Sequence, residues 1–101
     1  IFNRSIVREH VMVPEIETVS MCRWLAKSHG YLLGGSTGTA LAGLKKKSST
    51  LKSTDIVVVI SPDGGEKYLD TIYCDDWVKD KFGAHALEAK PQVETGAFEY
   101  A

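Results

Sequence analysis

The sequence lacks several features that would place it in a specialised class of protein. Its 101 residues include only two cysteines and three histidines. Two cysteines are too few for a disulfide scaffold, and Cys22 and Cys74 are not spaced as metal ligands. There is no run of about 18 apolar residues and no basic-then-apolar leader. We therefore expect a cytoplasmic chain with no metal and no membrane segment, in which each cysteine is a small buried apolar residue.

A strong charge of one sign is also missing. The net charge is −1, so the basic surface typical of nucleic-acid binders is not expected. The charge is nevertheless divided: residues 1–54 carry eight Lys/Arg and three Asp/Glu, a net of +5, whereas residues 55–101 carry four and ten, a net of −6. We expect these halves to face each other or a common partner. The length allows one domain or part of one.

The spacing of apolar residues predicts two helices in the first half of the chain. Residues 15–28 place four apolar side chains on one stripe, and Gly30 is a natural stop. The stripe consists of Ile16, Val19, Cys22 and Ala26. Residues 34–38 are predicted as a loop and residues 39–47 as a second helix with a solvated, lysine-rich end.

Two segments are predicted as strands. Residues 11–13 precede a proline, which favours extended backbone. Residues 56–60 (IVVVI) form a continuous β-branched run, typical of a strand buried on both faces of a parallel sheet. The remaining segments are, in chain order, a turn, a short helix or turn, a short terminal helix and a loosely ordered tail: 62–65, 66–73, 75–83 and 84–101.

The stretch GGSTG at residues 34–38 carries the most chemical information. A glycine-rich turn that opens a helix lets the backbone approach a ligand, and Ser36 and Thr37 add hydroxyl groups. The stretch has neither the lysine of a P-loop nor the spacing of a dinucleotide fingerprint, so a serine or threonine that simply caps the helix is the alternative. No Ser/His/Asp set can be placed, because all three histidines are expected at the surface: His10, His29 and His85.

Two motifs identify a family. The string LGGSTGTA at residues 33–40 is followed, after a helix and a strand, by PDGGEKYLDT at residues 62–71. Residues 31–83 thereby resemble the C-terminal third of the fold-type II pyridoxal-phosphate enzymes, the cysteine synthase and cystathionine β-synthase family. The resemblance implies an α/β fold, part of a three-layer open parallel sheet like that of the tryptophan synthase β-subunit. It assigns residues 1–83 to the C-terminal portion of the catalytic domain and implies pyridoxal 5'-phosphate as cofactor.

The string YCDDWVKDKFG at residues 73–83 looks most like one branch of that family, which supplies diaminopropionate precursors to siderophores and peptide antibiotics. Similar enzymes join O-phospho-L-serine to L-glutamate, form N-(2-amino-2-carboxyethyl)-L-glutamate and release phosphate. Relatives that use a sulfur nucleophile are the alternative within the class, and a non-catalytic α/β interaction module is the alternative outside it. The resemblance also implies a homodimer.

The resemblance assigns roles residue by residue. Ser36 matches the serine whose hydroxyl contacts the pyridine nitrogen of the cofactor, and Gly35, Thr37 and Gly38 belong to the same cofactor loop. Asp63 lies in the turn that would close the floor of the cofactor site. For Asp63, and also for Glu66 and Tyr68, a purely structural role is an equal alternative.

The resemblance also places the family's Schiff-base lysine, its phosphate-binding loop and an asparagine that contacts the cofactor ring in a part of the enzyme before residue 1. The lysines that this chain does contain are expected on the surface and do not match: Lys27, Lys45, Lys46, Lys47 and Lys52. The resemblance therefore implies a C-terminal piece that is inactive by itself and works with the upstream N-terminal portion of the same enzyme.

Overall fold

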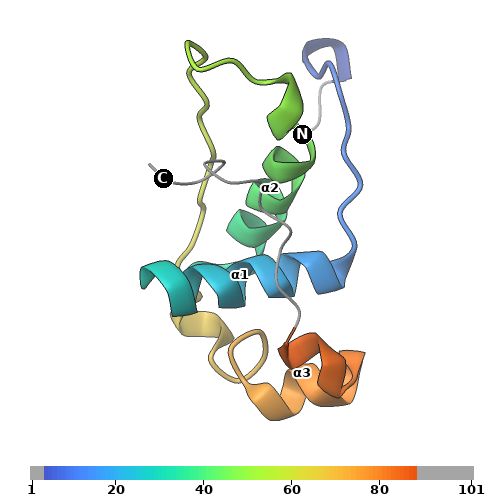
Figure 1. Cartoon of the computed structure of the whole chain (residues 1–101), viewed down its shortest axis with the longest axis vertical. Helices are drawn as coiled ribbons and strands as arrows, with labels where there is room; N and C mark the ends of the chain where they lie inside the picture. Colours follow the sequence, from blue (N-terminus) through green and yellow to red (C-terminus); the bar gives the residue numbers. More distant parts are fainter. Residues whose placement is uncertain (1–3, 89–101) are drawn as a thin grey trace.

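Three α-helices and four short 3-10 helices build the part of the chain described by the computed structural model, residues 4–88. The α-helices are α1 (Glu15–His29), α2 (Gly35–Lys46) and α3 (Asp75–Phe82). The 3-10 helices are η1 (Arg4–Ile6), η2 (Ser48–Thr50), η3 (Gly65–Tyr68) and η4 (Ala84–Leu87). In Figure 1, α1 lies across the middle of the molecule, with α2 on one side and α3 on the other.

Helix α1 confirms the predicted helix and forms the centre of the fold. It follows Pro14 and ends at Gly30, whose φ of 74° is the left-handed conformation that favours glycine. Its buried side chains face two ways. Val19 and Cys22 join the apolar cluster beside α3, whereas Met21 and Leu25 join the cluster beside α2. This two-sided burial explains why α1 is the element that the other helices share.

The predicted terminal helix is also confirmed. Helix α3 ends before Gly83, and its Val78 is fully buried against the α1 cluster. Helix η4 follows immediately and buries Ala86 in the same cluster. Ala86 and Leu87 of the predicted tail are therefore packed, and its residues 89–101 lie outside the described part.

The two strand predictions are wrong for this structure, because residues 4–88 contain no strand. The isolated antiparallel bridge in these residues joins Leu33 to Gly64. Residues 11–13 and 56–60 run as extended segments on opposite sides of α2 and so do not pair with each other (Figure 1). Instead of being buried on both faces, Ile56 and Val58 are 93% and 83% exposed. A parallel strand needs neighbouring strands on which to form its hydrogen bonds, and the described residues supply none.

The start of α2 also differs from the prediction. The expected loop at residues 34–38 is the cap and first turn of the helix, which begins at Gly35 rather than at residue 39. Gly34 is the N-cap, and no side chain caps the helix through a hydrogen bond. The alternative in which Ser36 or Thr37 is the capping residue is therefore wrong. The hydroxyl groups of both residues are left for other contacts.

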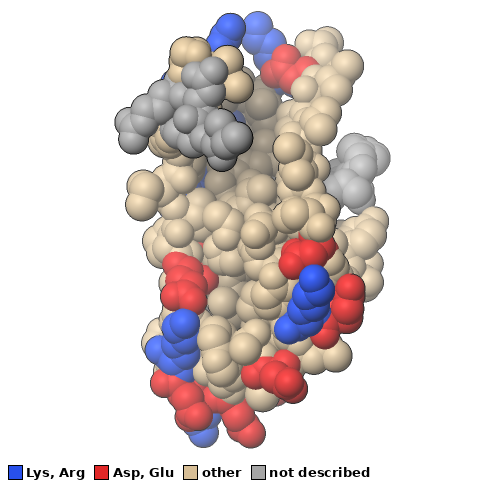
Figure 2. Space-filling view, turned by 180° about the vertical axis from the view of Figure 1, so that it is seen from behind, with Lys and Arg blue, Asp and Glu red and all other residues tan. Residues whose placement is uncertain are grey.

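Charged side chains are unevenly spread on the surface. Figure 2 shows a band without charge across the middle of one face, with acidic groups most frequent below it. An ion pair between Arg23 and Asp75 joins the basic half of the chain to the acidic half. The three histidines are exposed and Cys22 is buried, as predicted, whereas Cys74 is only partly buried. Within residues 4–88, no helix is long and apolar enough to cross a membrane, and no group of three or more His, Cys, Asp or Glu could hold a metal ion.

Candidate functional site at the start of α2

The first turn of α2 presents one hydroxyl to solvent and buries the other. Ser36 is exposed, whereas Thr37 is only 3% exposed. The Thr37 Oγ1 lies 2.7 Å from the Oγ of Ser61, so a hydroxyl–hydroxyl hydrogen bond ties the turn to the chain that follows residues 56–60. The two neighbouring residues therefore differ in function: Thr37 anchors the turn, and Ser36 is available to a ligand.

Close packing at two glycines holds this turn against α1 and against Ile72, which follows η3. A Cβ on Gly38 would lie 2.3 Å from Cys22 Sγ and 2.9 Å from the carbonyl oxygen of Thr18. A Cβ on Gly35 would lie 3.2 Å from Ile72 Cδ1. Glycine is thus needed at position 38 for close approach to α1, whereas a Cβ at position 35 would require only a small shift of the Ile72 side chain.

Asp63 meets the turn from a different part of the chain. A Cβ on Gly34 would lie 2.0 Å from Asp63 Oδ1, so the carboxylate rests against the helix cap. The Tyr68 hydroxyl donates a 2.7 Å hydrogen bond to Asp63 Oδ2, and this bond is the main reason why the pKa of Tyr68 is raised. The other oxygen, Oδ1, is buried without a hydrogen-bond partner.

A second tyrosine, Tyr73, supports Leu33, the residue directly before the N-cap of α2. The Tyr73 hydroxyl donates to the carbonyl oxygen of Leu33 and accepts from its N–H at 3.1 Å. The Cys22 thiol donates to the carbonyl oxygen of Gly34 at 3.6 Å. Burial raises the pKa of Cys22, and burial is also the first cause that raises the pKa of Tyr73 to about 12. Both groups therefore remain neutral near pH 7.

The structure brings all the predicted site residues to one end of α2: Gly35, Ser36, Thr37, Gly38 and Asp63. Of the other two residues whose roles were left open besides Asp63, Tyr68 belongs to this cluster through Asp63, whereas the exposed Glu66 contacts Gly64. Sequence reasoning missed Ser61 and Tyr73, which lie 24 and 40 positions from their partners. A hydroxyl residue directly before the PDGG turn was the available signal for Ser61; none was available for Tyr73.

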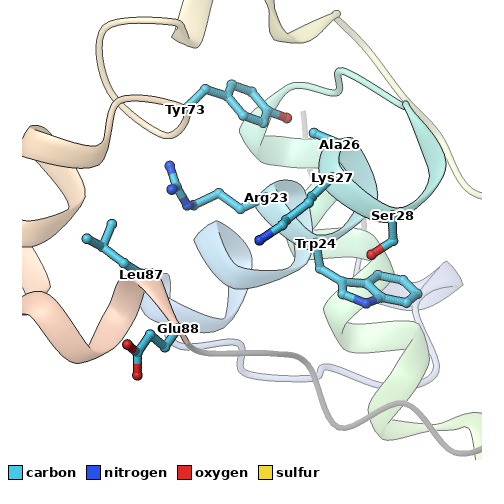
Figure 3. A pocket seen from close by; sticks show the side chains of 8 residues that line it. All are labelled: Arg23, Trp24, Ala26, Lys27, Ser28, Tyr73, Leu87 and Glu88. Carbon is cyan, nitrogen blue, oxygen red and sulfur yellow. The ribbon is translucent and has the colours of Figure 1, made fainter.

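A separate cavity of about 1010 Å³ opens beside the C-terminal half of α1 (Figure 3). Arg23 and Lys27 point into it from α1, and Tyr73 and Leu87 line it from the other elements. None of the predicted site residues lines this cavity. Arg23 is also engaged, through Asp75 and through a 3.1 Å hydrogen bond to the carbonyl oxygen of Ile72.

Comparison with known families adds a decisive observation to this geometry. The family model of pyridoxal-phosphate dependent enzymes matches residues 1–63, more than half of the chain. The chain belongs to the pyridoxal-phosphate dependent enzymes of fold type II. The cofactor of the family is pyridoxal phosphate, and its fold is α/β. Residues 4–88 contribute helices to that fold, with 11–13 and 56–60 as extended segments.

The residues at the start of α2 fit this cofactor. The N–H groups of a helix's first turn lack intrahelical partners, and the adjacent Ser36 supplies an exposed neutral hydroxyl. The carboxylate of Asp63, whose Oδ1 is buried without a hydrogen-bond partner, packs against the cap at the same end of the helix and supports the turn that carries Ser36. Lys45 and Lys46 lie in the last turn of α2, at the far end of a 12-residue helix that is about 18 Å long. Lys46 pairs there with Glu17 at 3.0 Å, so these lysines do not reach the site.

Proposed function

We propose that this chain is part of a pyridoxal-phosphate dependent synthase that replaces the phosphate group of O-phospho-L-serine with the amine of L-glutamate. The products are N-(2-amino-2-carboxyethyl)-L-glutamate, a diaminopropionate precursor for a siderophore or peptide natural product, and phosphate. The observation that carries the proposal is Ser36, an exposed hydroxyl on a turn whose other residues are fixed by packing. The sequence string at residues 73–83 favours this branch of the family.

When bound, pyridoxal phosphate withdraws electrons from the substrate carbon that bears the amino group. The Ser36 hydroxyl would contact the pyridine nitrogen, and as a neutral group it would not hold that nitrogen protonated as a carboxylate would. A neutral partner limits electron withdrawal, which suits loss of a good leaving group from the β-carbon more than transamination or racemisation. Gly35, Thr37 and Gly38 would keep the turn close to the ring edge.

The upstream N-terminal portion of the same enzyme is the proposed partner. It would supply the Schiff-base lysine, the phosphate-binding loop and the remaining strands of the sheet. The exposed β-branched run at residues 56–60 supports this proposal, because Ile56 and Val58 expose apolar side chains that a parallel sheet would cover. By itself the chain would be inactive; the assembled enzyme would be a cytoplasmic homodimer.

The test uses the full-length protein and measures phosphate release from O-phospho-L-serine, with L-glutamate or sulfide as nucleophile. We expect product formation with L-glutamate, and a loss of at least about tenfold in Ser36→Asp, because a carboxylate changes the protonation of the ring nitrogen. Ser49→Ala, an exposed serine on η2, is the matched control and should keep full activity.

Three outcomes would count against the proposal in different ways. Product formed only with sulfide would favour the cysteine synthase-like alternative. Unchanged elimination in Ser36→Asp would remove the assigned role of Ser36. Failure of the full-length protein to develop the visible absorption band of lysine-bound cofactor would favour the non-catalytic module.

A further inference from the structure

Asp63 lies in the turn that the resemblance places at the floor of the cofactor site, and the neighbours of its carboxylate in the structure are protein groups. It packs against Gly34, where a Cβ would come within 2.0 Å of Oδ1 and 3.1 Å of the Asp63 carbonyl oxygen. Gly34 has a φ of −76°, which any residue can adopt. Glycine is therefore required at position 34 for space, and that space is filled by Asp63.

The carboxylate of Asp63 is fixed by a hydrogen bond and lies at the positive end of the α2 dipole. The Tyr68 hydroxyl binds Oδ2 at 2.7 Å and fixes the direction of the side chain. Gly34 is the N-cap of α2, so the negative group lies at the helix end where N–H groups are unpaired and the dipole is positive. This placement compensates for burying Oδ1 without a hydrogen-bond partner.

The turn that Asp63 touches needs such support. Three of the five residues from Gly34 to Gly38 are glycines, and a glycine inside a helix costs about 1 kcal/mol relative to alanine. Gly34 has no side chain that could cap α2 itself. The position of Ser36, two residues after Gly34, thus depends on contacts from outside the helix.

We propose that Asp63 is a positioning residue: anchored by Tyr68, it fixes the cap of α2 and thereby the direction of the Ser36 hydroxyl, without contacting the cofactor itself. The inference rests on the proposed function in one respect only, namely that Ser36 contacts the cofactor. The packing of Asp63 against the first turn of α2 does not depend on the cofactor.

Two measurements on the full-length protein test the inference. The first is amide hydrogen exchange, without cofactor, at Gly38, whose N–H donates to the carbonyl oxygen of Gly34 at 3.2 Å. Asp63→Ala should accelerate exchange there about fivefold, because it removes the carboxylate that packs against Gly34 at the positive end of the helix dipole, and Tyr68→Phe should do so less. Asp63→Asn keeps the volume and a hydrogen-bond acceptor for Tyr68, so it should restore most of the protection. Asp70→Ala, an exposed acidic residue on the same turn region, is the matched control and should leave exchange unchanged.

The second measurement is titration with pyridoxal phosphate, followed by the absorption of the bound cofactor. Asp63→Ala should weaken binding about tenfold, as is typical when a group that orients a ligand-binding residue is removed. Its absorption should shift in the same direction as in Ser36→Ala, and the double variant should show no further change, because both act through one contact.

Unchanged exchange at Gly38 in Asp63→Ala would overturn the inference. Additive effects in the double variant would also overturn it, since Asp63 would then act on the cofactor independently of Ser36. If wild-type protein bound no cofactor, the proposed function would fail instead, and the exchange measurement alone would decide the role of Asp63.

Discussion

Cys22 of α1 and Gly38 of α2 touch where the two helices cross, so closely that a Cβ on Gly38 would lie 2.3 Å from Cys22 Sγ. The same Cβ would lie 2.9 Å from the carbonyl oxygen of Thr18, which is backbone and cannot rotate away. The distance between α1 and the first turn of α2 is therefore set by the lack of a side chain at position 38.

This contact predicts opposite effects for two glycine substitutions in one helix. Gly38→Ala should destabilise the fold by about 2 kcal/mol, because α1 and α2 must separate to admit the methyl group. Gly43→Ala should stabilise it by about 0.5–1 kcal/mol, because its Cβ would meet Val13 at an ordinary 3.6 Å and alanine is the better helix former. Urea unfolding of both variants checks the prediction; equal effects of the same sign would contradict it.

The pKa of Tyr73 predicts a loss of stability at high pH. Burial raises this pKa from 10.0 to about 12, so the folded state favours the neutral phenol. The resulting stabilisation is complete below pH 10 and declines as the pH rises from about 10 to about 12. The free energy of unfolding, measured across this range, should fall.

The variant Tyr73→Phe should make that fall shallower. At pH 7 it should cost about 1 kcal/mol, because it removes the hydroxyl that serves both backbone groups of Leu33. A fall with pH as steep as in the wild type would mean that other groups, such as the Cys22 thiol with its own raised pKa, cause the decline.

The exposed run at residues 56–60 predicts a difference between this chain and the assembled enzyme. Val58→Asp should change the stability of the 101-residue chain by no more than about 0.5 kcal/mol, because Val58 is 83% exposed. In the full-length protein the same variant should prevent assembly or destabilise it by more than 3 kcal/mol, because a carboxylate would be buried in the sheet. Ser53→Asp, at an exposed polar position, is the control and should be tolerated in both. A soluble, stable full-length Val58→Asp protein would argue against burial of this run.

Arg23 makes an ion pair with Asp75 and a hydrogen bond to Ile72, and we expect the loss of these two contacts to have unequal effects on stability. Arg23→Ala removes both the ion pair with Asp75 and the hydrogen bond to the carbonyl oxygen of Ile72, and should cost about 1–2 kcal/mol. Asp75→Asn should cost less than about 0.5 kcal/mol, because the Asp75 side chain is largely exposed and the Ile72 bond remains. Thermal unfolding compares the two. Equal losses would show that the ion pair, not the Ile72 bond, holds the elements together.

The elements that could be predicted from the sequence are those whose causes are local. Helix α1 follows from apolar residues at helical spacing and ends at Gly30, and α3 has acidic residues in its first turn and a glycine stop. The strand prediction at residues 56–60 is wrong for this structure, because a β-branched run forms a buried strand only beside neighbouring strands, and residues 4–88 contain none.

The candidate site was predictable in composition but not in geometry. The glycines at 34, 35 and 38 favour a loop by local preference. They nevertheless form the cap and first turn of α2, because this turn contacts Ser61 and Asp63, which lie more than 20 residues away in the sequence. The same distance explains why the contact between Asp63 and Gly34, which decides the role of both residues, has no signature in either motif alone.

The exposed run at residues 56–60 has a consequence for handling the protein. Five uncharged β-branched residues without proline or glycine form the type of segment that adds to copies of itself and starts cross-β aggregates. Because most of its apolar side chains face solvent here, we expect this run to promote self-association of the chain as its concentration rises. Co-expression with a partner that covers the run is therefore the route to soluble material.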